Sequence, residues 1–363
     1  MSHPAIIRVA VIGLGWAARS IWLTRLLSHP SFVVTAVVDP DPAARAAVRR
    51  EGVDTRSFAS VAELDAATLD LAVLAVPNHL HSSMACELLY RGISVFVEKP
   101  VCLTAAEADQ LASAELAGPG MLLAGSAARY RADIQRLHAV VEQIGALRHV
   151  EVSWIRARGV PGAGGWFSQR QLSGGGALVD LGWHLLDVVS LLLGPVDFSR
   201  VVGTTSNDFI RTGAADTAWR ADRPAMNGSS DVEDTARGFL VTGSGVSVSL
   251  STSWASHELV DVTSIRVYGR DGTADLRCTF GFTPIRVPRS ALSRTRLGET
   301  TAIPVPNELI GAEYDRQLDA IPAMLVDPAS RGRAAVESRR TVSVIERLYD
   351  SAHQYPVATY TQA

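Results

Sequence analysis

From the start of the chain to about residue 125, short apolar runs rich in β-branched residues alternate with stretches rich in alanine and leucine. Several of these runs are almost continuously apolar, which is typical of strands buried on both faces of a parallel sheet. The predicted strands are residues 6–12, 32–38, 69–76, 93–97 and 121–124. Strands that alternate with helices predict βαβ units and a doubly wound parallel sheet.

Two of the stretches between these strands are predicted as helices with clear boundaries, residues 79–90 and 104–116. Thr104 and Glu107 have the spacing of a capping box, in which each side chain accepts a hydrogen bond from the backbone N–H of the other residue. The second of these helices is therefore expected to begin just after Thr104.

Beyond about residue 130 the pattern changes, with more alternation of apolar and polar positions and more serine and threonine. Residues 149–156 and 245–254 are predicted strands of this kind, which indicates a mostly antiparallel sheet with one face solvated or covered by a partner. A glycine-rich loop at 159–176 leads into a strongly apolar helix at 177–193. Residues 207–231, rich in glycine, serine and aspartate, are expected to form a surface excursion.

The length of 363 residues predicts two domains, since domains usually hold roughly 100 to 200 residues. The change of pattern places them at residues 1–125 and 126–363. The formal net charge of -3 provides no field that would attract nucleic acid or an anionic membrane surface. Two domains leave a cleft between them, and partners of these two kinds are disfavoured.

The cysteines and the N-terminal residues indicate in which cellular compartment the protein is expected. Cys86, Cys102 and Cys278 are few, odd in number and far apart, which favours the reducing cytoplasm over a disulfide framework and offers no zinc-type spacing. Arg8 interrupts the first apolar run and Gly13 ends it, so we expect neither a secretion signal nor a membrane span.

A glycine-rich turn follows the first predicted strand and opens a helix. Its residues, in the pattern G-x-G-x-x-A, are Gly13, Leu14, Gly15, Trp16, Ala17 and Ala18. Gly13 suits the tight turn, Gly15 lets the backbone approach a pyrophosphate, and Ala18 allows close packing of helix and strand. The N–H groups of the helix start then face the phosphates. Alone, the same glycines would also suit a turn with no ligand.

The second predicted strand ends at Asp39, 21 residues after Ala18. A carboxylate at this place accepts hydrogen bonds from the ribose hydroxyls of the adenosine half of a dinucleotide, and it would repel a 2′-phosphate. No arginine follows at once, so NAD is favoured over NADP. The alternative is that Asp39 only caps the turn that it forms with Pro40 and its neighbours.

A lysine stands at the end of the strand predicted at residues 93–97, in the sequence Glu98-Lys99-Pro100. The carboxyl ends of parallel strands border the crevice where doubly wound sheets bind ligands. Pro100 restricts the backbone that presents Lys99. The alternative is a solvated lysine at a strand end.

The strongly apolar helix carries three polar residues, Asp180, His184 and Asp187. Their spacing of four and three residues places them on one helical face. A carboxylate and an imidazole among apolar neighbours are costly to bury unless they are paired or functional. They are either a catalytic pair or a structural pair that anchors the helix.

Taken together, these motifs resemble the glucose-fructose oxidoreductase / inositol dehydrogenase / rhizopine catabolism (Gfo/Idh/MocA) family of NAD(P)-dependent oxidoreductases. The resemblance spans nearly the whole chain in the expected order. Its landmarks are the glycine turn at residues 13–18, Pro77-Asn78-His79-Leu80-His81, Glu98-Lys99-Pro100, the block at 174–187 and Val232-Glu233-Asp234-Thr235-Ala236.

The resemblance implies an N-terminal Rossmann domain and a C-terminal α/β domain with a large open sheet, whose face usually builds a homodimer or homotetramer. It also implies that Lys99, Asp180 and His184 meet around the reacting carbon. His184 would then take the hydroxyl proton, because imidazole titrates near neutral pH. Lys99 would stabilise the alkoxide or polarise the ketone, and Asp180 would orient the pair and the substrate.

The resemblance implies further that NAD is bound by the backbone of the glycine turn and by residues around the nicotinamide. These cofactor residues are Gly13, Leu14, Gly15, Trp16, Ala17, Asp39, Pro77, Asn78, His81, Glu98 and Lys99.

The expected substrate contacts, besides the catalytic residues, are Arg129, Arg156 and Trp166, with Arg158 nearby. Many relatives place an asparagine just before the arginine at position 129, whereas this chain has Ala128, which puts one polar substrate contact in doubt. The residues at 156, 158 and 166 either touch a polar or acidic substrate or lie at the rim of the site.

The function predicted is hydride transfer between nicotinamide and a secondary hydroxyl or ketone of a sugar, inositol, amino-cyclitol or nucleotide-linked sugar. One alternative is a glycosidase or lyase that oxidises its substrate transiently with a tightly bound NAD. Another is a non-catalytic regulator that senses the dinucleotide, although intact Lys99, Asp180 and His184 argue against it.

Overall fold

The structure is a computed structural model, and it describes residues 6–161, 165–212 and 230–354. Most of the expected surface excursion at 207–231 lies outside these residues. By its internal contacts the chain divides into two compact units. The first contains Met1–Gly125 and Tyr314–Arg340, and the second contains Ser126–Glu313 and Thr341–Ala363.

The first unit contains a six-stranded sheet in the order β3-β2-β1-β4-β5-β6, and all its paired strands are parallel. This order is that of a doubly wound sheet, in which the chain turns back at β1. The strands are β1 (Ile7–Ile12), β2 (Phe32–Val38), β3 (Arg56–Phe58), β4 (Leu71–Leu74), β5 (Ser94–Val97) and β6 (Leu122–Ala124). The five strands predicted from the sequence are confirmed, and β3, only three residues long, was not predicted.

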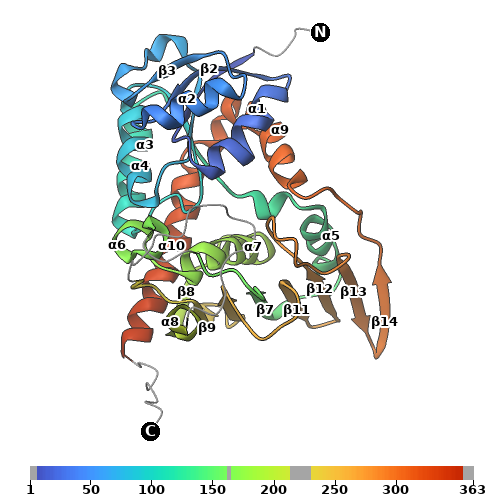
Figure 1. The fold of residues 1–363 in the computed structure, drawn as a ribbon. Helices are drawn as coiled ribbons and strands as arrows, with labels where there is room; N and C mark the ends of the chain where they lie inside the picture. Colours follow the sequence, from blue (N-terminus) through green and yellow to red (C-terminus); the bar gives the residue numbers. More distant parts are fainter. Residues whose placement is uncertain (1–5, 162–164, 213–229, 355–363) are drawn as a thin grey trace, which may run out of the picture. The chain divides into compact units, whose positions relative to one another are not determined.

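Helices pack on this sheet, and α3 and α4 lie side by side (Figure 1). The helices of the first unit are α1 (Thr24–Ser28), α2 (Pro42–Arg50), α3 (His81–Tyr90), α4 (Ala105–Ala117), all but the first two residues of α9 (Ala312–Val326) and the first part of α10 (Arg333–Gln354). The predicted cap of α4 forms in part. Thr104 accepts the N–H of Glu107 at 3.1 Å, but Glu107 accepts the N–H of Leu103, not of Thr104.

The second unit contains an eight-stranded sheet in the order β14-β13-β12-β11-β7-β10-β9-β8. Among the strands that the structure describes here, only β7 and β10 pair in parallel, so the predicted mostly antiparallel sheet is confirmed. The strands are β7 (Leu147–Ile155), β8 (Phe198–Ser206), β9 (Thr235–Thr242), β10 (Ser247–Ser253), β11 (Val262–Gly269), β12 (Thr273–Cys278), β13 (Ala291–Arg296) and β14 (Glu299–Ile303).

One face of this sheet is covered by helices of the same unit. Helix α5 (Ala132–Val141) packs on β12, and α7 (Trp183–Leu193) packs on β7. Leu348 of α10 lies over β8 and β9, where glycines leave room for it. The smaller helices of this unit are α6 (Arg170–Ser173) and α8 (Asp208–Thr212).

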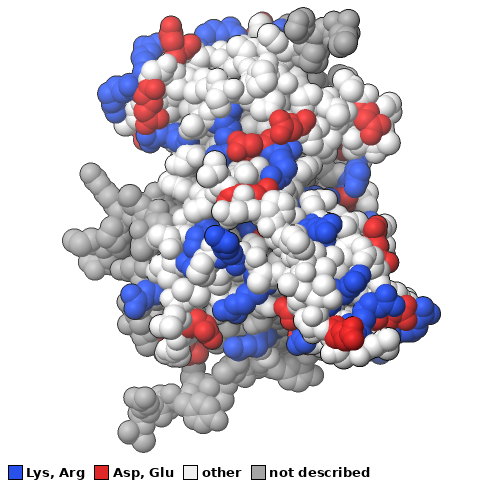
Figure 2. All heavy atoms as spheres, turned by 90° about the vertical axis from the view of Figure 1, so that its right-hand side faces the viewer, with Lys and Arg blue, Asp and Glu red and all other residues white. Residues whose placement is uncertain are grey.

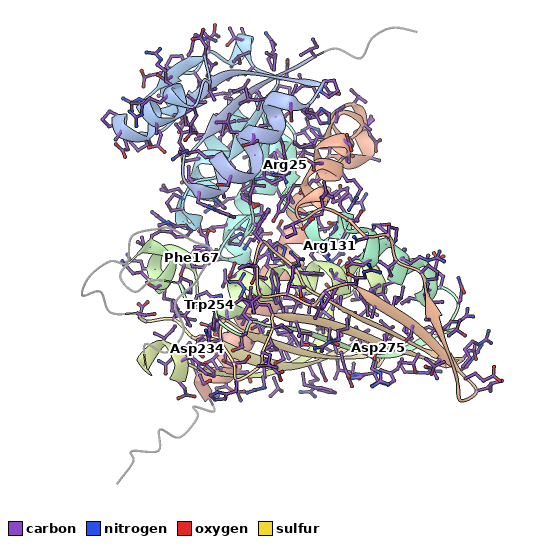
Figure 3. All side chains as sticks on the ribbon, turned by 45° about the vertical axis from the view of Figure 1, so that its right-hand side comes forward. Arg25, Arg131, Phe167, Asp234, Trp254 and Asp275 are labelled. Carbon is purple, nitrogen blue, oxygen red and sulfur yellow. The ribbon has the colours of Figure 1, made fainter. Side chains whose placement is uncertain are left out.

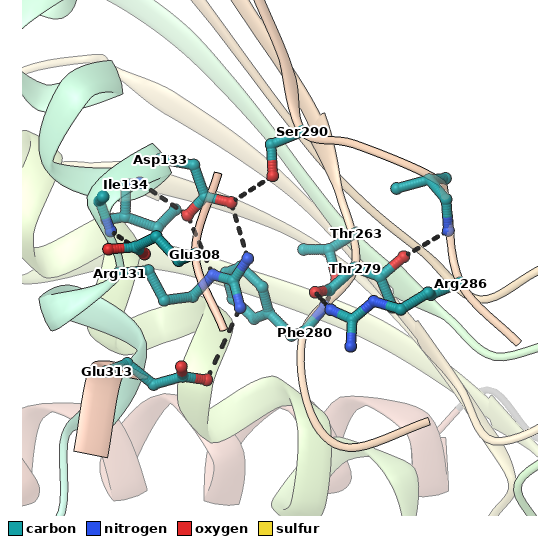
Figure 4. Close-up of polar contacts among 12 residues, drawn as sticks. Arg131, Asp133, Ile134, Thr263, Thr279, Phe280, Arg286, Ser290, Glu308 and Glu313 are labelled. Atoms are coloured by element: carbon teal, nitrogen blue, oxygen red, sulfur yellow. Dashed lines mark hydrogen bonds and ion pairs between the residues drawn. The ribbon is translucent and has the colours of Figure 1, made fainter. Parts of the chain in front are cut away.

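A buried polar network ties the start of α5 to the loops after β12 and β14 (Figure 4). Arg131 donates two hydrogen bonds to Asp133, at 2.9 and 2.7 Å, and forms an ion pair with Glu313 at 3.6 Å. Its guanidinium lies 4.6 Å from the centre of the Phe280 ring, and Ser290 donates to Asp133 at 2.8 Å. Burial alone would raise the pKa of Asp133, but the charge of Arg131 holds that pKa below its usual value.

Arg131→Met should destabilise the protein by about 3–5 kcal/mol, because it leaves two buried carboxylates without their cation. Arg266→Met is the matched control. It removes a half-exposed ion pair with Asp275 on the same sheet, which is worth less than about 1 kcal/mol. Urea unfolding at pH 7 measures the free energy of unfolding of the two variants. Equal losses of this free energy in Arg131→Met and Arg266→Met would contradict the prediction.

Acid should weaken the same network. A carboxyl whose pKa is lowered on folding stabilises the protein above its unfolded pKa of about 3.9 and loses that contribution as the pH falls through the folded value. We therefore expect the effect of Arg131→Met on stability to shrink below about pH 4.

Acidic and basic side chains are mixed over the face shown in Figure 2, in keeping with the small net charge of -3. Among the residues that the structure describes, one helical stretch, Arg170–Leu193, is long and apolar enough to cross a membrane by length and composition alone. The most apolar 18 residues of this stretch are 83% buried inside the protein, as expected for a core helix.

Candidate active site

The glycine turn of the first unit has the geometry that its sequence predicts. Gly13 has a φ of +81°, and a Cβ placed on it would lie 2.6 Å from the carbonyl oxygen of Ala75. A Cβ on Gly15, in contrast, would meet nothing within 4 Å. Gly13 is therefore required by the fold itself, whereas the space beside Gly15 is open to a ligand. This difference fits the approach of a pyrophosphate to the backbone at Gly15.

Gly15→Ala should therefore leave the stability of the protein unchanged within about 1 kcal/mol. Its new methyl would occupy the space of the pyrophosphate, so we expect NAD affinity to fall by about 10- to 100-fold. Calorimetric titration with NAD and thermal unfolding without it measure the two effects. Gly13→Ala is the control, since strain and the contact with Ala75 should lower the unfolding temperature directly. Unchanged NAD binding in Gly15→Ala would contradict this use of the turn.

Asp39 connects the end of β2 to the glycine turn. Its carboxylate accepts the N–H of Leu14 and the N–H of Asp41, both at 2.8 Å. The side chain thus shapes its own turn and also stands beside the turn that would hold the dinucleotide. Arg45, which no sequence motif singled out, lies on α2 and donates to the carbonyl oxygens of Asp39 at 2.5 Å and of Pro40 at 3.1 Å.

His81 holds together the two loops that follow β4 and β5. It is 1% exposed, and its ring nitrogens lie 2.6 Å from the carbonyl oxygen of Pro100 and 2.9 Å from that of Val76. Burial lowers the pKa of this imidazole. Within the first unit, His81 therefore links the loop that begins at Pro77 to the loop that contains Lys99.

Lys99 is the second residue after β5, at the carboxyl end of the parallel sheet. Its N–H donates to its neighbour Glu98 at 2.7 Å, and Glu98 is buried against Gly125. Asn78, also buried, lies at the carboxyl end of the adjacent strand β4. These side chains occupy the edge at which doubly wound sheets bind ligands.

Lys99 is also the one lysine in the sequence, since 33 of the 34 basic side chains are arginine. Arginine keeps its charge at any ordinary pH, whereas an ammonium is a compact donor that can titrate. At every other position with a permanently basic side chain this sequence has arginine, and it has lysine only at the end of β5. This is a signal that the sequence analysis missed.

Asp180 and His184 belong to one buried helical segment of the second unit. The segment begins with a π-helical turn, Leu178–Gly182, and continues as α7. Each of the two residues is 9% exposed. The predicted helix is confirmed, but its first turn is wider than the α-helical spacing suggests. Single π-helical turns occur frequently at functional sites.

The carboxylate of Asp180 contacts residues that directly follow strands β10 and β7. The indole N–H of Trp254 donates to it at 2.9 Å, and the guanidinium of Arg156 lies 3.6 Å away. The rings of Trp254 and Phe167 are 5.8 Å apart (Figure 3). Arg156, expected to contact substrate or to lie at the rim, is buried and paired with Asp180.

His184 packs beside an aromatic ring of the same unit. The ring centre of Trp154 lies 5.6 Å from that of His184, and Phe280 packs edge-on against Trp154 at 5.3 Å. One turn along α7, Asp187 forms an ion pair with Arg129, which the sequence analysis placed among the substrate contacts.

Trp166 is half-buried and packs edge-on against Phe167 at 5.1 Å, while Arg158 is exposed. Among the described residues, no group of three or more His, Cys, Asp or Glu side chains is placed to hold a metal ion. Trp254, which no motif singled out, is the main functional candidate that the sequence analysis did not find.

Two family models match the chain. Residues 7–122 match an oxidoreductase family with an NAD-binding Rossmann fold, and residues 134–275 match the GFO/IDH/MocA C-terminal domain. The first unit therefore contains an NAD-binding Rossmann domain.

Individual proteins are also similar. The chain is 58% identical over 347 residues to the putative UDP-kanosamine synthase oxidoreductase subunit of Amycolatopsis mediterranei (strain S699), covering 95% of this chain and 96% of that protein. It is 28% identical over 254 residues to the D-glucoside 3-dehydrogenase of Escherichia coli (strain K12), covering 69% and 70%. The crystal structure of GenD2 from gentamicin A biosynthesis, in complex with NAD, has a TM-score of 0.73 at 24% identity, with coverage of 97% and 96%. This last similarity concerns the fold alone.

Proposed function

Because the chain belongs to the GFO/IDH/MocA family of oxidoreductases, we propose that it oxidises one secondary hydroxyl of a nucleotide-linked sugar to a ketone, with NAD as the hydride acceptor. The observation that carries this proposal is the 58% identity, over 95% of the chain, to a protein named as the oxidoreductase subunit of a UDP-kanosamine synthase. UDP-linked hexoses are therefore the first substrates to test.

The position of oxidation follows from chemistry and from a second relative. An amino sugar such as kanosamine carries an amine where the parent sugar carries a hydroxyl, and a ketone at that carbon allows the exchange. The name of the D-glucoside 3-dehydrogenase states oxidation at C3 of a glucoside. We propose C3 of a UDP-linked hexose as the reacting carbon.

The residues of the first unit suit the dinucleotide. The backbone of the turn at Gly13, Gly15 and Ala17 would hold the pyrophosphate, and Asp39 would accept bonds from the adenosine ribose. Asn78 and Glu98 would lie beside the nicotinamide. NAD, when bound there, supplies the acceptor for the hydride. The carboxylate of Asp39 supports NAD over NADP, since it would repel a 2′-phosphate.

The proton chemistry would come from three residues acting around one carbon. His184 would take the proton of the sugar hydroxyl, and its burial beside Trp154 would limit access of water to the ring. Lys99 would stabilise the negative charge that develops on the oxygen. Asp180, held by Trp254 and paired with Arg156, would orient the imidazole and the sugar.

The expected substrate contacts divide into two groups in this proposal. Arg156 and Arg129 would act through the carboxylates to which they are bound, Asp180 and Asp187. Trp166 and Arg158, which are more exposed, would reach the sugar or its diphosphate.

The test is a turnover assay with UDP-glucose, glucose, methyl glucoside and myo-inositol, each with NAD and with NADP. Absorbance of NADH would be followed with a hydrazide present to trap the ketone. We expect NADH formation with UDP-glucose and NAD, and a trapped ketone at C3.

Equal rates with free glucose or inositol would overturn the assignment to nucleotide-linked sugars. Cleavage of the sugar without net NADH would indicate a redox glycosidase or lyase, and NAD binding without turnover of any sugar would indicate a regulator.

A further inference from the structure

Glu233 lies beside the start of the helical segment that carries Asp180 and His184. It is 6% exposed and precedes β9, 55 residues after Leu178 in the sequence. Its side chain accepts the N–H of Gly176, at 3.1 Å to each carboxylate oxygen, and the N–H of Leu178 at 2.9 Å. Its backbone carbonyl accepts the N–H of Ala177 at 3.1 Å.

One residue therefore binds three consecutive N–H groups at the start of the helix. The first N–H groups of a helix have no partner within the helix, so a buried helix start needs acceptors from elsewhere. A carboxylate is also favoured there by the helix dipole. In the part of the chain that the structure describes, Glu233 forms no ion pair, so N–H groups and one hydroxyl stabilise its charge.

The hydroxyl belongs to Tyr349 of α10, which donates to Glu233 at 2.9 Å. The glycines before the helix make this arrangement possible. A Cβ on Gly176 would lie 1.8 Å from the carbonyl oxygen of Glu233, and a Cβ on Gly175 would lie 1.9 Å from the Tyr349 hydroxyl. The glycine motif of the sequence thus provides space for the backbone carbonyl of Glu233 and for the hydroxyl of Tyr349.

We propose that Glu233 is a positioning residue for the reaction, because it fixes where the helix begins and thereby where Asp180 and His184 are held. Asp180 lies only two residues beyond Leu178, so any shift of the first turn moves its carboxylate directly. His184 follows one turn later on the same segment. The inference rests on the proposed roles of Asp180 and His184.

Loss of the Glu233 carboxylate should lower kcat much more than it changes KM. A displacement of about 1 Å in a catalytic group can cost on the order of 100-fold in rate, so we expect a loss of that size in Glu233→Ala. Glu233→Gln keeps the shape and one acceptor oxygen, so it should restore part of the rate. Tyr349→Phe removes one donor to Glu233 and leaves the bonds from Glu233 to the helix in place, so it should have the smallest effect.

Glu115→Gln is the matched control for the burial of a carboxyl. Glu115 is 1% exposed, lies on α4 and accepts the N–H of Leu122, at the start of β6, at 3.0 Å, and it is not among the residues assigned to catalysis or cofactor binding. The Glu115→Gln substitution should lower the unfolding temperature of the protein and leave kcat unchanged. Rates are measured with UDP-glucose and NAD, at a temperature where each variant is folded.

Hydrogen exchange of the segment from Gly174 to Leu193 gives a readout without turnover. Glu233→Ala and Glu233→Gln should exchange faster in the first turn of the helix, and Glu115→Gln should not. If the Ala variant does not fold, the Gln and Tyr349→Phe variants carry the comparison.

Two outcomes would overturn the inference: a kcat in Glu233→Gln equal to that of the unaltered protein, or unchanged exchange in the first turn. If the unaltered protein turns over no sugar, the proposed function fails separately, and the exchange data still decide whether Glu233 holds the helix start.

Discussion

Lys99→Ala should lower kcat by at least about 10²- to 10³-fold, the usual cost of removing a donor to a developing oxyanion. In the proposed reaction, the sugar oxygen gains negative charge as its proton leaves, and the ammonium of Lys99 offsets that charge. NAD affinity should change little, because the glycine turn and Asp39 are untouched. Steady-state rates and calorimetric titration with NAD measure the two effects.

Lys99→Arg separates charge from chemistry. It retains the positive charge, but guanidinium is larger, forked and cannot be deprotonated in proteins. We expect it to recover little of the lost rate. Normal turnover in Lys99→Ala would remove this residue from the mechanism.

His184→Asn should lower kcat for oxidation by about 10²- to 10⁴-fold, the usual contribution of a positioned general base. An imidazole must be unprotonated to take the hydroxyl proton. The oxidation rate of the unaltered enzyme should therefore rise with pH, and this limb should disappear in His184→Asn. Rates from about pH 5 to 9 test the point.

His149→Asn is the control, since His149 lies on β7 and contacts Ser247 of the neighbouring strand at 2.7 Å. It should leave the pH profile unchanged. A profile that also persists in His184→Asn would assign the base to another group.

The architecture of the first unit could be predicted because its strands are nearly continuous apolar runs with helices between them. Edge strand β3 has no buried residue in its three positions, so it leaves no apolar pattern. The contacts of α9 could not be predicted either. Helical periodicity shows that one face is buried, but not that residues from Tyr314 onward pack with the first unit.

The candidate site was predictable where its residues are close in sequence. Asp180 and His184 stand out as polar residues on an apolar helix. Trp254 and Arg156, which contact Asp180, directly follow strands β10 and β7, which are distant in sequence and adjacent only through sheet register. Glu233 was visible as part of a motif, yet its bonds to the helix start depend on three-dimensional packing alone.

The single lysine at the end of β5 makes this protein unusually easy to label at one chosen point. Reductive methylation with ¹³C-formaldehyde modifies amines and leaves guanidinium groups intact. Besides the amine at the chain terminus, only Lys99 would carry the isotope, so its methyl resonance could be followed during addition of dinucleotide or sugar without mutagenesis.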